Sequence, residues 1–246
     1  MSNPMQGVKI KLTGGYVIHM EMCGEISREC NDAVLKAYHT ILKMMREGEV
    51  KGIEEVVPTY TALTVFYDPR KTTWRAVSNT LKEVISESSR RSFGDVFTPK
   101  QYEIPVAYGG VWGPDLVSVA SEAGLTEDEV IRVHTSRSYR CYMLGFTPGF
   151  LYLGEVDERI AVPRLKNPRV KVPAGSVGIA GLQTGVYGIE SPGGWRIIGR
   201  TPLKMFDPRR VPPTPIRPGD LVRFFEVGEE EFRELKEVFI GEFKTR

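Results

Sequence analysis

The segment from residue 145 to residue 207 constrains the fold of this chain more than any other part. Glycine or proline recurs every few residues there, and only short apolar runs separate them. A long helix is excluded, because proline removes a helix hydrogen bond and glycine disfavours helical backbone. Short strands joined by tight turns satisfy the same pattern. The segment therefore predicts a mainly-β region, a barrel or a sandwich rather than a parallel sheet.

The first hundred residues follow a different pattern. Alternating apolar residues predict four strands, at residues 8–12, 16–22, 50–57 and 61–67. Apolar residues at three- and four-residue spacing predict helices over 27–47 and 73–89. Ser27 or Asn31 is a candidate N-cap for the first helix, and Gly48 a candidate C-terminal stop. We expect an α+β layer with its helices on one face of the sheet.

Between these regions, short elements lead into the glycine-rich segment. Asp115 is a candidate cap for a helix over 116–123, and Thr126 with Glu129 fits a capping box. A strand is expected over 138–144. Near the C-terminus the pattern predicts a strand over 221–227 and a helix over 229–238. We place the domain boundary at residue 100, giving domains over 1–100 and 101–246.

Composition excludes several classes of protein. The 33 basic and 31 acidic residues nearly balance, which argues against a nucleic-acid surface. Three cysteines without a Cys-x-x-Cys pair make a disulfide scaffold or a zinc ribbon unexpected. Neither a signal-peptide pattern nor an apolar run of membrane-spanning length is present. The cytoplasm is the expected location, without membrane association.

Three glycine- and proline-containing turns, at 146–150, 163–169 and 191–195, carry side chains suited to a small anionic ligand. Guanidinium groups pair with carboxylate or phosphate, and glycine lets backbone N–H groups approach closely. Gln183 and Tyr187 offer an amide and a hydroxyl for a lactam or urea-like group. The candidate substrate-binding residues are Phe146, Pro148, Gly149, Arg164, Arg169, Gln183, Tyr187, Gly193, Gly194, Trp195 and Arg200. The alternative is that they are barrel turns with solvated arginines.

His134 is the candidate catalytic residue, as a general acid or base close to the glycine-rich segment. The alternative is a helix-end histidine that interacts with the helix dipole. His19, His39 and the cysteines show no metal-ligand spacing, so no metal site is expected. Neither a phosphate-binding loop nor a nucleophile with an evident base is present. We therefore expect this chain to contribute only part of an active site rather than to be a complete enzyme.

Five linked motifs identify a family. They are GFTPGFLYL, the PR…PR…VPAGSVGIAG run, QTGVYG, SPGGW and GRTP. Together they resemble the B-subunit family of prokaryotic ATP-dependent 5-oxoprolinase, which has also carried the labels allophanate hydrolase subunit 1 and KipI. The chain is similar too to half of the carboxyltransferase region of urea carboxylase. Thr147 departs from the more apolar residue expected in the first motif.

The resemblance implies a ferredoxin-like α+β N-terminal domain followed by a cyclophilin-like β-barrel domain. It implies two partners, a KipA-like C subunit and an A subunit, and an enzyme that opens 5-oxoproline to glutamate with ATP. ATP would be bound by the complex, and this chain would be inactive alone. The reaction requires activation of the amide oxygen before water attacks. Two alternatives remain: a KipI-type inhibitor of a histidine kinase, and a urea carboxylase or allophanate hydrolase subunit.

Overall fold

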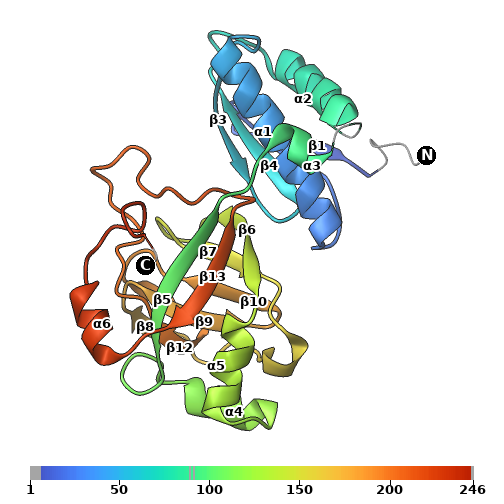
Figure 1. The fold of residues 1–246 in the computed structure, drawn as a ribbon. Helices are drawn as coiled ribbons and strands as arrows, with labels where there is room; N and C mark the ends of the chain where they lie inside the picture. Colours follow the sequence, from blue (N-terminus) through green and yellow to red (C-terminus); the bar gives the residue numbers. More distant parts are fainter. Residues whose placement is uncertain (1–6, 89, 91, 245–246) are drawn as a thin grey trace. The chain divides into compact units, whose positions relative to one another are not determined.

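A computed structural model describes residues 7–88, 90 and 92–244 of the chain. These residues form two compact units, Met1–Thr98 and Pro99–Arg246 (Figure 1). The first is an antiparallel sheet with helices, and the second is a closed barrel. The predicted fold class, an α+β N-terminal domain plus a mainly-β cyclophilin-like barrel, is confirmed.

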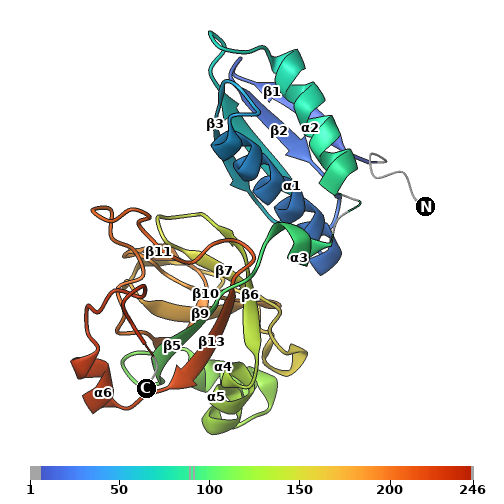
Figure 2. The same ribbon diagram turned by 45° about the horizontal axis from the view of Figure 1, so that its top comes forward.

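The first unit is a four-stranded sheet in the order β1-β2-β4-β3, with every neighbouring pair antiparallel. Its elements are β1 (Lys9–Thr13), β2 (Val17–Glu21), α1 (Arg28–Glu47), β3 (Ile53–Pro58), β4 (Ala62–Tyr67), α2 (Trp74–Ser88) and α3 (Phe93–Val96). Figure 2 shows α1 and α2 side by side on one face of the sheet, as the sequence predicted. The run β2-α1-β3-β4-α2 has the strand–helix–strand–strand–helix order of a ferredoxin-like unit. The edge strand β1 precedes this run instead of following it.

Helix α1 begins and ends where its capping residues predicted. The Ser27 side chain accepts a hydrogen bond from the Cys30 backbone N–H at 3.0 Å, which satisfies a donor that the helix leaves unpaired. Gly48 ends the helix with φ of 72°, a conformation that glycine adopts without steric cost. The apolar stripe, including Val34, Leu35 and Ile41, is fully buried against the sheet. It is core packing.

A disulfide joins Cys23 to Cys30 in this unit, with the two Cα atoms 6.1 Å apart. The odd cysteine count gave no expectation of it. Cys23 lies in the segment before α1, and Cys30 lies in the first turn of that helix. The chain reversal at the start of α1 therefore brings together two cysteines that are seven residues apart in sequence. Cys141, in the second unit, is a buried free thiol.

The second unit is built on a barrel with the strand order β10-β7-β6-β13-β5-β12-β9, closed by pairing of β9 with β10. Its strands are β5 (Gln101–Tyr108), β6 (Ser138–Leu144), β7 (Leu151–Gly154), β9 (Ser176–Ala180), β10 (Gln183–Val186), β12 (Arg196–Arg200) and β13 (Leu221–Glu226). The pair β13–β5 is parallel, and the other pairs are antiparallel. A separate two-stranded sheet pairs β8 (Arg169–Val172) with β11 (Ser191–Gly193).

Four short helical segments accompany the barrel: α4 (Leu116–Ala123), α5 (Glu127–Thr135), the 3₁₀ turn η1 (Glu158–Ile160) and α6 (Glu229–Glu234). The predicted capping box of Thr126 and Glu129 is confirmed at the start of α5. The helix predicted over 229–238 is shorter, because α6 ends at Glu234 and Glu237 adopts a φ of 66°. None of the helices among the described residues combines the length and the apolar character needed to cross a membrane.

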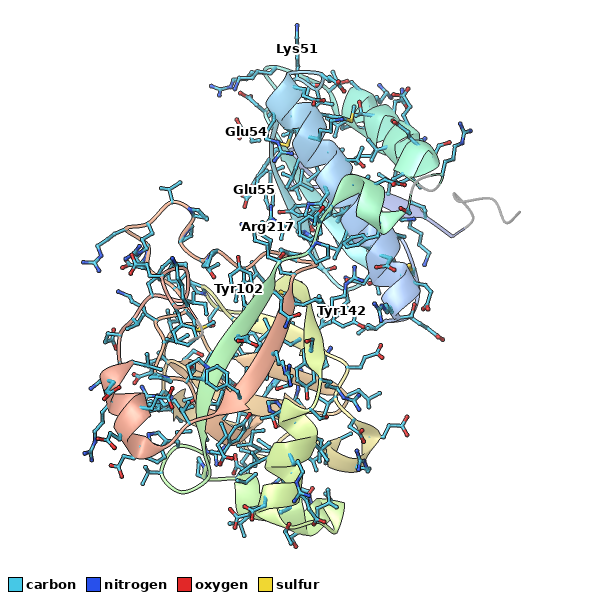
Figure 3. All side chains as sticks on the ribbon, in the orientation of Figure 1. Lys51, Glu54, Glu55, Tyr102, Tyr142 and Arg217 are labelled. Carbon is cyan, nitrogen blue, oxygen red and sulfur yellow. A yellow bond between two sulfur atoms is a disulfide. The ribbon has the colours of Figure 1, made fainter. Side chains whose placement is uncertain are left out.

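The buried carboxylate of Asp220 fixes the turn before β13. It accepts hydrogen bonds from the backbone N–H groups of Lys100, at 2.9 Å, and Arg217, at 2.8 Å. These bonds hold the turn beside the start of β5, where β13 pairs in parallel. Burial raises the pKa of Asp220, although the two N–H donors oppose that shift. On β5, the Tyr102 hydroxyl donates to the Pro215 carbonyl at 3.0 Å (Figure 3).

Candidate functional site

A cavity of about 260 Å³ lies beside an aromatic cluster of the second unit. Six of the predicted site residues line it: Phe146, Arg164, Tyr187, Gly193, Gly194 and Trp195. They come from three turns and from the end of β10. The fold therefore brings these six residues together around one cavity.

Aromatic packing positions the walls of this cavity. Phe150, which is buried immediately before β7, packs edge-to-face on Tyr187, with ring centroids 4.8 Å apart. The same ring packs on Trp195 at 5.4 Å. Edge-to-face pairs of this kind add about 0.5–1.5 kcal/mol each beyond the burial of apolar area. The Tyr187 and Trp195 rings are therefore held in place by the core.

Arg164 supplies the positive charge of the cavity. Its side chain comes from the exposed loop after Pro163, and the guanidinium carbon lies 5.8 Å from the centre of the Trp195 ring. Within the described part of the chain, Arg164 forms no ion pair, so the stacking contact alone orients it. A guanidinium above an aromatic face keeps its N–H donors available for a carboxylate or phosphate. This side chain meets the requirement for an anion-binding group.

The Tyr187 hydroxyl is the second polar group of the cavity. The residue is fully buried, and its oxygen has no hydrogen bond of normal geometry within the described residues, although the Trp195 backbone N–H lies close to it. Burial raises the pKa of Tyr187, while that N–H and the charges of Arg164 and Arg169 oppose the shift. A Cβ at Gly193 would lie 2.1 Å from this oxygen, so only glycine fits there. A buried phenol without a normal hydrogen bond can gain one if a polar atom of a ligand comes within reach.

The first predicted turn borders the cavity through one side chain. Phe146 is 61% exposed and adopts a φ of 61°, a conformation that non-glycine residues rarely occupy. Gly149 has a φ of 72°, and a Cβ there would come 2.6 Å from Phe206. Pro148 is exposed on the same turn. Pro148 and Gly149 thus shape the turn, and only Phe146 lines the cavity.

Arg169 does not belong to an anion clamp, which corrects the prediction. Its guanidinium forms a bidentate ion pair with the buried carboxylate of Asp115, at 2.7 and 2.9 Å. Asp115 also accepts the Ile197 backbone N–H at 2.7 Å. Asp115 occupies the predicted N-cap position of α4, but its side chain makes no capping hydrogen bond there. The pair ties β8 to the start of α4.

Gln183 and Arg200 lie apart from Arg164, contrary to the prediction of one converging set. Gln183 begins β10 and Tyr187 follows the end of that strand. Tyr187 lines the smaller cavity, whereas Gln183 does not. Arg200, the last residue of β12, lines a different cavity of about 500 Å³.

His134 is fully buried, and it lines neither of these two cavities. Its Nε2 lies 2.9 Å from the Thr184 hydroxyl, which donates its own proton to the Gly178 carbonyl. Nε2 must therefore carry the imidazole proton, and Nδ1 accepts the Tyr108 O–H at 2.8 Å. Burial lowers the pKa of His134 to about 3. A neutral histidine with both nitrogens bonded cannot move substrate protons, so the catalytic assignment is corrected to a structural one.

Known proteins share this architecture and its motifs. A family model described as the carboxyltransferase domain, subdomain C and D, matches residues 8–216. The 5-oxoprolinase B subunit of Bacillus subtilis is 44% identical over 225 residues, covering 85% of this chain and 90% of that protein. The chain belongs to the 5-oxoprolinase B-subunit family. The B subunit of Escherichia coli O157:H7 is 56% identical over 122 residues, which cover 50% of this chain and 56% of that protein.

Other proteins similar to this chain differ in how much of their own length the match covers. The urea amidolyase of Saccharomyces cerevisiae is 23% identical over 242 residues, which span 13% of its length. Among solved structures, TTHA0988 matches with a TM-score of 0.73 and 36% identity over 87% of this chain, but the match spans only 40% of that protein. A conserved uncharacterized protein of Pyrococcus horikoshii, PH0987, matches over 91% of this chain and 100% of its own, with 50% identity and a TM-score of 0.53.

Some residues of this B-subunit site escaped the sequence prediction. Tyr152, Pro168 and Pro192 also line the smaller cavity, and each neighbours a predicted residue within a quoted motif or turn. Asp115 was assigned a capping role, and its contact with Arg169 spans 54 residues, which no local pattern encodes. The described residues contain no group of three or more His, Cys, Asp or Glu side chains placed to hold a metal ion.

Proposed function

We propose that this chain is the B subunit of an ATP-dependent 5-oxoprolinase, which opens 5-oxoproline to glutamate together with a C subunit and an A subunit. The observation that carries the proposal is a relative named as the B subunit of 5-oxoprolinase, 44% identical, of which the chain covers 90%. We propose a heteromeric enzyme because the relatives are named as subunits and because this chain lacks an evident nucleophile with a base. A partner chain then supplies the remaining catalytic groups.

The smaller cavity contains the chemical groups needed to bind 5-oxoproline. In the proposed complex, the carboxylate of 5-oxoproline pairs with the Arg164 guanidinium, which has no competing carboxylate among the described residues. The flat lactam ring lies against the Trp195 indole, and the Tyr187 hydroxyl bonds a polar atom of the lactam. A cavity of about 260 Å³ lies near the lower end of the usual range for ligand pockets, which fits a small metabolite.

Reconstitution tests the proposal. The full chain is co-expressed with candidate C and A subunits, and glutamate formed from 5-oxoproline and ATP is measured. We expect glutamate only when all three chains and ATP are present. A purified three-chain complex that forms no glutamate would contradict the proposed function.

The urea amidolyase relatives and the carboxyltransferase family model favour one second candidate, a component of an enzyme acting on urea or allophanate. The same complex is therefore offered urea with bicarbonate, and allophanate, each with ATP. Turnover of either compound in place of 5-oxoproline would support this second function. Turnover of 5-oxoproline alone would support the first.

A further inference from the structure

The larger cavity, of about 500 Å³, belongs to the barrel unit and is not explained by the substrate site. It lies beside Gly188, which follows Tyr187 of the smaller cavity, so the two cavities border consecutive residues. Its boundary includes the end of β12 and the segment after α6, which are linked by hydrogen bonds such as Glu237 N–H to the Pro202 carbonyl at 3.1 Å. Its volume lies within the usual range for small-molecule sites.

Aromatic rings form part of this cavity. Trp112 and Phe232 pack with ring centroids 5.3 Å apart, and Phe206 also lines the cavity. Trp112 and Phe206 are half-buried, so their rings retain exposed surface. Exposed aromatic surface inside a concave site is what a planar heterocycle stacks against.

Two cations at this cavity have no acidic partner among the described residues. The Nε of Arg200 donates to the Ala174 carbonyl at 2.8 Å, and its Nη groups have no hydrogen-bond partner among the described residues. Lys236 is exposed, and its side chain forms no hydrogen bond or ion pair within the described part of the chain. The other two cations of the cavity are paired, Lys204 with Asp207 at 3.0 Å and Arg233 with Glu229. Arg200 and Lys236 are thus available for an anion.

The cavity also contains two carboxylates. Glu190 is paired with Lys171 at 3.0 Å, whereas the Glu237 side chain has no partner among the described residues. An unpaired carboxylate accepts hydrogen bonds from amino or hydroxyl groups. A ligand that uses the whole cavity therefore needs a planar ring, donor groups and an anionic end. A nucleotide carries all three, in its base, its sugar and its phosphates.

We propose that the larger cavity binds a purine nucleoside polyphosphate, with the base against Trp112 and Phe206 and the phosphates on Arg200 and Lys236. The choice of ATP as the nucleotide rests on the proposed function, because the opening of 5-oxoproline to glutamate would consume ATP. The proposal assigns the nucleotide to this chain, adjacent to the substrate cavity across Tyr187 and Gly188. The two ligands then approach each other at the boundary of the two cavities.

Calorimetric titration of the purified full chain, without partner chains, tests the assignment. The probes are ATP, tripolyphosphate and adenosine. We expect saturable binding of one ATP per chain, with tripolyphosphate and adenosine each at least about tenfold weaker because each lacks part of the ligand. Arg200→Ala and the surface variant Lys236→Ala should each weaken ATP binding by about tenfold, the loss of one charge-assisted hydrogen bond.

Two controls locate the site. Arg223→Ala removes an exposed β13 arginine that is remote from the cavity lining, and Arg164→Ala removes the cation of the smaller cavity; both should bind ATP as the wild type does. The inference is overturned if wild type shows no saturable binding at millimolar ATP, or if tripolyphosphate binds as tightly as ATP. It is also overturned if Arg164→Ala, rather than Arg200→Ala or Lys236→Ala, weakens binding. Glutamate formation by a complex whose isolated B subunit does not bind ATP would remove this inference alone, and ATP binding without turnover would remove only the proposed function.

Discussion

Two regions of the barrel unit contain basic side chains beside aromatic rings, and they differ in how far their polar groups are satisfied. In the interior, His134 packs on Phe224, with ring centroids 4.8 Å apart, and both of its nitrogens are bonded to hydroxyl groups. At the smaller cavity, Arg164 lies over Trp195 without an ion pair in the described chain, and the Tyr187 hydroxyl lacks a bond of normal geometry.

This difference separates structural from functional polar groups. A buried polar group with all its partners contributes to folding and resists chemistry, because any new bond must replace an existing one. A group at a cavity that has no partner in the fold can bond a ligand without breaking a hydrogen bond within the protein. By this criterion we propose that Arg164 and Tyr187 bind the ligand, whereas His134 and the Asp115–Arg169 pair contribute to the stability of the barrel. Substitutions of Arg164 or Tyr187 should therefore change mainly activity, whereas substitutions of His134 or Asp115 should change mainly stability.

The largest effect is expected at Arg164. In the reconstituted complex, Arg164→Ala should lower kcat/KM for 5-oxoproline by about 100-fold or more, because a charge-assisted contact to the substrate is lost. Lys166→Ala is the matched control, since it removes an exposed cation from the same loop that does not line the cavity. Equal activity of the two variants would remove Arg164 from the site.

Asp115→Ala should destabilise the barrel by roughly 2–3 kcal/mol. It leaves Arg169, whose side chain is 32% exposed, without its partner and also leaves the Ile197 N–H without an acceptor. Urea denaturation measures the change. Arg159→Ala breaks an exposed pair with Asp157 and should cost less than about 1 kcal/mol. Similar losses for both variants would show that the buried pair does not hold the barrel.

His134 should make the barrel less stable in acid. The unfolded histidine binds a proton below its ordinary pKa of 6.5, whereas the folded pKa is about 3, so between these values the unfolded state binds more protons. The free energy of unfolding should therefore fall by about 2 kcal/mol from pH 7 to pH 5 on account of this residue.

The His134→Gln variant should lose that part of the pH dependence and keep its activity in the reconstituted complex. Denaturation at the two pH values measures the first effect, and NMR titration of the imidazole measures the pKa directly in wild type. An imidazole that titrates near 6.5, or a folded variant without activity, would return His134 to the list of catalytic candidates.

The smallest effect is expected for Tyr187→Phe. Loss of a hydroxyl that has no normal bond in the fold should leave stability unchanged or raise it by up to about 1 kcal/mol. Activity should fall by about tenfold, because one hydrogen bond to the ligand is lost. The variant is compared with wild type by denaturation and by turnover. Lower stability with full activity would mean that the hydroxyl is bonded within the fold.

Local patterns predicted the elements well, whereas long-range partners escaped them. Helix α1 was predictable because Ser27 and Gly48 act on adjacent backbone and the apolar stripe follows the helical period. The turns around Trp195 were predictable because glycine and proline act locally. The different partners of Arg164 and Arg169 were not predictable. Both residues follow a proline in sequence, and only the fold brings Asp115 next to Arg169. The Cys23–Cys30 bond likewise depends on the reversal before α1.

A crystal structure of the assembled complex with 5-oxoproline would show whether a small anion binds at Arg164 and Trp195. We predict ligand density in the smaller cavity, with a carboxylate within hydrogen-bonding distance of the Arg164 guanidinium and the ring against the Trp195 indole. Density for 5-oxoproline at a site that contacts neither side chain would show that this cavity does not bind the substrate.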